Sequence, residues 1–112
     1  MKKFKFKLSP QLGEYVTRIA RNTIETGRIT SLIVGSLSGK KDHFSLMVVL
    51  LCEGVFRSVY AKSVVRGTIK TLTLTQAELV AMHYLFIYSN PGDNIFANQE
   101  LLAMFDKALL SL

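Results

Sequence analysis

The sequence predicts an α+β fold: a small mixed or antiparallel sheet of about four strands with helices, in the order βαββαβ followed by two C-terminal helices. The evidence is a strictly alternating basic segment at the start of the chain, short apolar runs in its middle, and helical patterns around them. The chain has 112 residues, 49% of them hydrophobic, which suffices for one core, so residues 1–112 are expected to form a single domain. The alternative is a mainly α fold with residues 42–66 as one long helix.

The first two elements have the clearest patterns. Residues 2–8 place Phe4, Phe6 and Leu8 on one face and three lysines on the other, which predicts a half-buried strand with a positive, solvent-facing side. Ser9-Pro10 is a typical helix start, because serine caps the first turn and proline suits the first helical position. Apolar residues then recur at helical spacing up to Gly27, where we expect the helix to end.

The middle of the chain allows two interpretations. Residues 29–37 and 44–51 are apolar runs around a polar loop, which favours a hairpin of two strands covered on both faces, followed by a helix over residues 53–66. The residues from Phe44 to Val64 also fit one uninterrupted helix capped by Asp42. Gly54 and several β-branched residues disfavour that helix, each by about 0.5–1 kcal/mol.

The remaining elements are a strand over residues 68–74, a helix from the capping box Thr75-Gln76-Ala77-Glu78 to about Ser89, a loop, and a last helix capped by Asn98. The first six elements follow the order of the ferredoxin-like split βαβ arrangement. That arrangement makes the first strand central, and helices covering its lysine face would bury three unpaired charges at great cost. We therefore expect the first strand at a sheet edge or with its lysine face uncovered.

Charge is unevenly distributed along the chain. The formal net charge is +6, with +7 in residues 1–41, +2 in residues 42–74 and −3 in residues 75–112. Such asymmetry predicts an N-terminal surface that contacts a polyanion through its phosphates, with affinity but without sequence selectivity. The candidate contact residues are Lys3, Lys5, Lys7, Arg18, Arg21, Lys40 and Lys41.

No pattern predicts catalysis, a metal site or a cofactor. The glycines of Gly35–Lys41 are spaced too closely for a phosphate-binding loop, and Lys41 stands where that loop needs serine or threonine. The histidines, His43 and His83, have no cysteine partner at metal-ligand spacing, and Cys52 ends an apolar run, where it is expected to pack as a small hydrophobe. We therefore expect a protein that is not an enzyme.

The sequence also predicts a cytoplasmic protein without a membrane partner. Its longest apolar run, Leu46–Cys52, is far shorter than the about 20 residues of a membrane span, and polar residues follow the basic start where a signal peptide would be apolar. A single cysteine rules out a disulfide framework and fits a reducing compartment.

The function expected from these features is that of a small binding module whose basic N-terminal surface contacts a polyanion such as nucleic acid, or an acidic protein. The apolar C-terminal third has more apolar surface than a monomer of this size readily buries, which predicts a dimer or larger homo-oligomer. Its candidate interface residues are Tyr84, Tyr88, Phe105 and Leu109. Packing of these side chains in the chain's own core is the equal alternative. The alternative function is that of a structural or protein–protein interaction subunit in which the basic charge serves only solubility.

Overall fold

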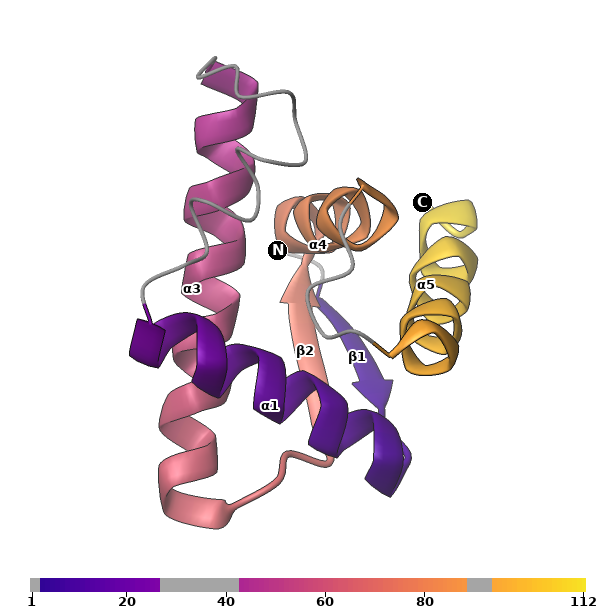
Figure 1. Ribbon diagram of the computed structural model, residues 1–112. Helices are drawn as coiled ribbons and strands as arrows, with labels where there is room; N and C mark the ends of the chain where they lie inside the picture. The colour runs from indigo at the N-terminus through magenta and orange to yellow at the C-terminus, as the bar shows by residue number, and fades with distance from the viewer. Residues whose placement is uncertain (1–2, 27–42, 89–93) are drawn as a thin grey trace.

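A computed structural model describes residues 3–26, 43–88 and 94–112 of the chain (Figure 1). These residues form mainly helices and one antiparallel sheet of two strands. In chain order, and with the labels of Figure 1, the elements are β1 (Lys3–Lys7), α1 (Pro10–Thr26), α3 (His43–Arg66), β2 (Thr71–Thr75), α4 (Gln76–Tyr88) and α5 (Ile95–Leu110).

The predicted four-stranded sheet with βαββαβ order is therefore wrong. Residues 44–51 are not a strand but the first two turns of α3, which continues without a break to Arg66, as in the mainly α alternative. The predicted strand over residues 29–37 lies outside the described part of the chain.

The long helix forms because one stripe of α3 is buried by elements distant in sequence. The stripe packs against α1 and α4. Each buried apolar side chain contributes about 1.5–3 kcal/mol, which together outweighs the propensity cost of Gly54 and the valines. The opposite side of the apolar run is open, since Leu46, Met47 and Leu50 are 47%, 55% and 68% exposed. The buried stripe comprises Val48, Val49, Cys52, Val55, Phe56, Val59 and Ser63.

The prediction of a first strand with a positive face is confirmed. β1 pairs with β2 so that Lys3, Lys5 and Lys7 lie opposite Thr75, Thr73 and Thr71. All three lysines are exposed, whereas Phe6 between them is buried. The alternation of side chains along a strand therefore separates a wet face of lysine and threonine from a face in the core.

Local capping signals set the starts of the helices. The Ser9 hydroxyl accepts a hydrogen bond from the Leu12 amide (3.2 Å) at the start of α1. At the start of α4, Thr75 Oγ1 accepts from the Glu78 amide (3.2 Å) and Glu78 Oε1 accepts from the Thr75 amide (2.8 Å), which confirms the capping box.

The predicted cap of the last helix is wrong. Asn94, four residues before Asn98, caps α5 and accepts from the Ala97 amide (3.1 Å). Asn98 instead donates its side-chain amide to the Phe86 carbonyl (3.2 Å), and its Oδ1 accepts from the Tyr15 hydroxyl (3.5 Å). It ties α5 to α4 and α1, a role that only the tertiary structure assigns.

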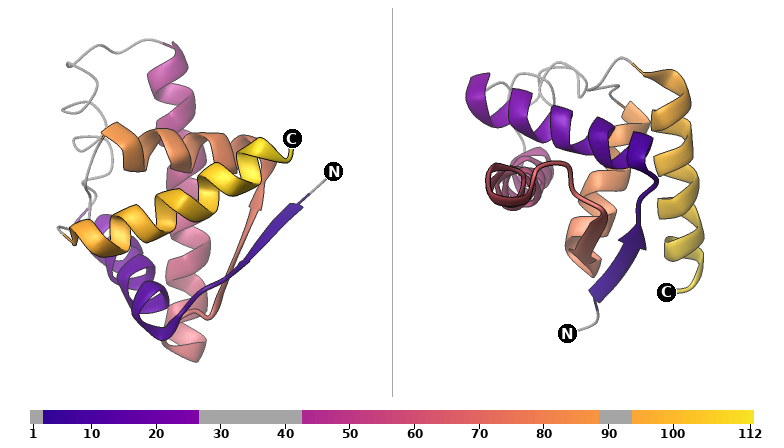
Figure 2. Two further views of the ribbon diagram at one scale, coloured as in Figure 1. Left: turned by 90° about the vertical axis from the view of Figure 1, so that its right-hand side faces the viewer. Right: turned by 90° about the horizontal axis from the view of Figure 1, so that it is seen from below.

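The core lies on one side of the sheet. Phe105 of α5 is fully buried and meets Phe6 of β1 and Phe86 of α4 edge to face, with ring centroids 5.4 and 6.2 Å apart. In the left view of Figure 2, α4 and α5 lie above the strands and α1 lies to their left. Phe6, which alternates with the lysines, packs against Phe105 of α5, so α5 covers the face opposite the exposed lysines. None of the described helices is long and apolar enough to cross a membrane.

Candidate functional site

The strongest candidate site is the lysine face of the sheet, which we define as Lys3, Lys5, Lys7 and the threonines opposite them. Alternate residues of a strand are about 6.8 Å apart, so the three ammonium groups form a row along β1. The ion pairs present in the described residues, Glu53–Arg57 and His83–Asp106, involve none of these lysines. Each lysine is thus available to an external anion.

A second group of cations adjoins the row where α3 leads into β2. Lys62 and Arg66 of α3 and Lys70 line a cavity of about 330 Å³ together with Thr68, Ile69 and Thr71. Thr71 belongs to both places, since it also pairs with Lys7. The cavity therefore extends the positive surface beyond the end of β1.

Lys62, Arg66 and Lys70 were not among the contact residues predicted from the sequence. Lys62 and Arg66 lie in the last turns of α3, where cations also favour the negative end of the helix dipole. The surplus of +2 in residues 42–74 was the available signal, but basic residues on both sides of Gly67 become neighbours only through the turn between helix and strand.

The remaining predicted polyanion contacts do not join the row. Arg18 and Arg21 lie exposed on α1, which is on the covered side of the sheet (Figure 2). Lys40 and Lys41 lie outside the described residues. The structure thus groups three of the seven predicted contacts.

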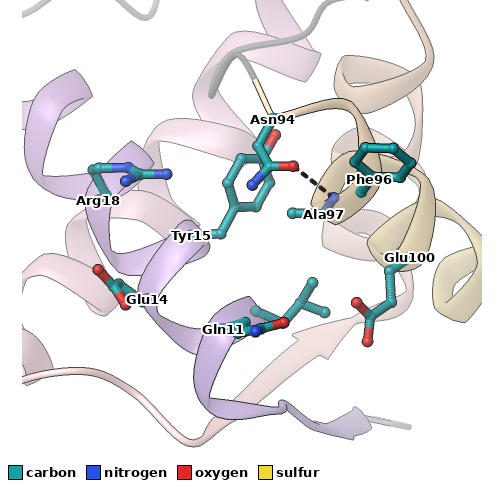
Figure 3. A pocket seen from close by; sticks show the side chains of 9 residues that line it. Gln11, Glu14, Tyr15, Arg18, Asn94, Phe96, Ala97 and Glu100 are labelled. Atoms are coloured by element: carbon teal, nitrogen blue, oxygen red, sulfur yellow. Dashed lines mark hydrogen bonds between the residues drawn. The ribbon is translucent and has the colours of Figure 1, made fainter.

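Arg18 lines a separate cavity of about 380 Å³ between α1 and the start of α5 (Figure 3). Glu14 and Arg18 of α1 lie on one side of it, and Phe96 and Glu100 of α5 on the other. Asn94 lies at its edge, with its side-chain oxygen bonded to the Ala97 amide. Two carboxylates beside one guanidinium make this a mixed-charge pocket and not an anion site.

The predicted oligomer-interface residues have different environments. Phe105 is fully buried within the chain, and Leu109 is half-buried. Tyr84 is half-buried and meets the Phe44 ring edge to face at 5.1 Å between centroids. Tyr88 is the last residue of α4, and its side chain is outside the described part of the structure.

A separate exposed apolar surface lies between α3 and α4. A groove of about 650 Å³ runs there, with an almost wholly apolar lining. Phe44, Met47 and Val80 line it and are each about half exposed. The sequence indicated this surface, because residues 44–51 are apolar on both faces of the strand that they were predicted to form. As part of a helix, the same run has one buried and one exposed apolar side.

Within the described residues, no three His, Cys, Asp or Glu side chains come together as a metal site. Burial raises the pKa of the Cys52 thiol to about 12, so the thiol is protonated at neutral pH and is not a nucleophile. His83 Nε2 lies 2.5 Å from Asp106 Oδ1 and links α4 to α5. No protein-family model, curated protein or solved structure matches the chain.

Proposed function

We propose that the protein is a small non-enzymatic binding module whose lysine face contacts a polyanion, with nucleic acid as the class to test first. The supporting observation is the row of three exposed lysines on the sheet face opposite the one that α5 covers, without a described carboxylate paired to it. The ammonium groups of such a row repel one another, and an anionic partner that binds to them reduces this repulsion.

The chemistry of the row defines the expected mode of binding. Lysine ammonium groups contact phosphate oxygens as point charges and do not read base edges, so affinity should vary little with base sequence. Three phosphate contacts to a single strand predict a slope of about −2 for log K against log salt concentration. Contacts from Lys62, Arg66 and Lys70 would steepen that slope.

The test is fluorescence anisotropy with a labelled thymidine oligonucleotide between about 50 and 200 mM salt. The double variant Lys3→Gln/Lys5→Gln should bind more weakly and reduce the salt slope by about 1.4. Arg18→Gln/Arg21→Gln removes the same net charge from the other side of the sheet and should change the slope little. Absent binding at the lowest salt, or equal loss in both variants, contradicts the proposal.

A second candidate function is that of a protein–protein interaction subunit that associates with itself as a dimer, in which the lysines serve only solubility. The apolar groove between α3 and α4 favours it, because large exposed apolar patches mark association surfaces. Met47→Gln/Val80→Gln changes two half-exposed side chains that line the groove and should convert a dimer into a monomer without loss of stability. Light scattering that reports a monomer for the unmodified protein at high concentration contradicts self-association.

The cytoplasmic location expected from the sequence stays a prediction.

A further inference from the structure

Among the residues that the structure describes, no hydrogen bond uses the outer edge of the β1 backbone. The Leu8 amide donates to the Lys70 carbonyl (2.9 Å), so these two residues form a hydrogen-bonded pair of the ladder. Such pairs alternate in an antiparallel ladder, which makes Phe6–Leu72 and Phe4–Leu74 the next hydrogen-bonded pairs. The N–H and C=O groups of Lys3, Lys5 and Lys7 therefore point away from β2, toward the outer edge of β1.

A groove of about 520 Å³ follows this edge, between β1 and the last turns of α5. Its charged lining consists of Lys3, Lys5, Lys7 and Lys107, with no carboxylate among the residues that form it. Phe4, Met104 and Ala108, all half-buried, supply an apolar wall on the α5 side. The groove thus offers backbone donors and acceptors along β1, the three lysines of β1 on one face, and apolar contacts together with Lys107 on the α5 side.

These features specify the chain that fits. A strand added to the edge presents alternate side chains to the two faces of the sheet. The side chains beside the lysines would be acidic, and those beside α5 would be apolar. A second copy of β1 does not fit, because antiparallel pairing about Lys5 sets lysines opposite lysines, and like charges directly opposite destabilise a strand pair.

We propose that the outer edge of β1 binds an extended acidic segment of a partner protein as a third strand of the sheet. The lysines then have two consequences: they prevent pairing between copies of this chain, as charged residues commonly do on edge strands, and they select an acidic partner. The proposal goes beyond the proposed polyanion contact, since it requires the backbone of β1 as well as its charges.

A labelled peptide of about ten residues, alternating glutamate and valine, is the probe, and the matched peptide with lysine for glutamate is its control. We expect the acidic peptide alone to bind. In amide hydrogen exchange followed by NMR, bound peptide should slow exchange at Lys5 and Lys7 by about tenfold or more, with no change at Phe4 and Phe6, whose amides already bond to β2. Binding without new protection at Lys5 overturns the proposal, as does failure of the acidic peptide to bind.

Two variants separate backbone from charge. Lys5→Gln removes the charge and should weaken peptide binding two- to fivefold. Lys5→Pro removes the charge and also the backbone N–H of residue 5. The β1–β2 ladder does not use this N–H, so the two strands can remain paired. Lys5→Pro should therefore bind the peptide about tenfold more weakly than Lys5→Gln does. Equal affinities of the two variants overturn the proposal, and if Lys5→Pro does not fold, exchange in the unmodified protein decides.

The same two variants distinguish this proposal from nucleic-acid binding. An oligonucleotide held by ammonium groups should bind Lys5→Pro and Lys5→Gln equally. If the oligonucleotide binds but the acidic peptide does not, strand addition is wrong and the polyanion proposal stands. The reverse result removes nucleic acid and retains strand addition.

Discussion

Gly13 lets α1 approach the segment that leads into β2. A Cβ atom at this position would collide with the backbone carbonyl oxygen of Ile69. One turn later, Thr17 Oγ1 donates to the Gly13 carbonyl (2.7 Å) and accepts from the Ile69 amide (3.2 Å). A glycine inside a helix costs about 1 kcal/mol relative to alanine, and this close contact explains why it is tolerated here.

The two helical glycines should respond oppositely to the same substitution. Gly13→Ala should lower the free energy of unfolding by about 1–3 kcal/mol, because the Ile69 backbone must move. Gly54→Ala is the matched control in α3. Nothing lies within 4 Å of its added Cβ, and stability should rise by about 0.5–1 kcal/mol. Urea unfolding measures both, and a stabilised Gly13→Ala contradicts the close contact.

Cys52 predicts a pH dependence of stability. Burial raises the pKa of its thiol from 9.0 to about 12, so between these pH values the folded chain keeps a proton that the unfolded chain has lost. The free energy of unfolding should therefore fall as pH rises through this window, by up to about 1.4 kcal/mol per pH unit, with no such loss below pH 9.

Cys52→Ala is the control for this effect, since other groups also titrate in alkali. The variant should show a shallower decline in stability than the unmodified protein in urea unfolding above pH 9. The difference between the two slopes is the measurement, so a constant loss from the smaller side chain does not matter. Identical slopes would show that the thiol is solvated in the folded state.

At the scale of elements, short polar motifs define where helices begin. Thr75 ends β2 and at the same time caps α4 through its reciprocal hydrogen bonds with Glu78. The strand therefore passes into the helix without an intervening loop. This tight junction fixes the direction in which α4 leaves the sheet and crosses the core.

Removing the Thr75 hydroxyl should test that junction. Thr75→Ala should cost about 1 kcal/mol of stability, because the Glu78 amide loses its capping acceptor. Thr75→Ser retains the hydroxyl and should stay within about 0.5 kcal/mol of the unmodified protein. Thermal or urea unfolding measures both variants, and equal losses would mean that side-chain packing, not the cap, explains the effect.

At the scale of the whole molecule, the first strand and the last two helices of the chain meet at Phe105. Its ring contacts Phe6 of β1 and Phe86 of α4 from the middle of α5. This cluster holds the covered face of the sheet against the C-terminal helices, so the sheet keeps its lysine face outward. The packing of the aromatic core thus determines which face of the sheet is buried and which is exposed.

Truncation of Phe105 should destabilise the entire fold. Phe105→Ala leaves a cavity among buried rings and should cost about 3–5 kcal/mol. Phe96→Ala, also in α5 but at a side chain that is 84% exposed, should change stability by no more than about 0.5 kcal/mol. Calorimetric unfolding compares the two, and similar midpoints would contradict the central place of Phe105.

Part of the candidate site could be predicted from sequence and part could not. The alternation of residues 3–7 places the lysines on one face of a strand whatever the rest of the chain does. Their neighbours Lys62, Arg66 and Lys70 come close only because α3 turns back at Gly67, whose positive φ of 78° suits glycine. Arg18 and Arg21 share the N-terminal charge of the lysines, but α1 packs on the other side of the sheet.

The sequence by itself determined the first strand, the helix after it and the capping box of α4, because these depend on periodicity and hydrogen bonds within a few residues. The tertiary structure decided whether residues 44–51 are strand or helix, where α5 begins and which charges share a surface. The physical reason is that an apolar run is compatible with both strand and helix, and only the burial supplied by α1 and α4 selects between them.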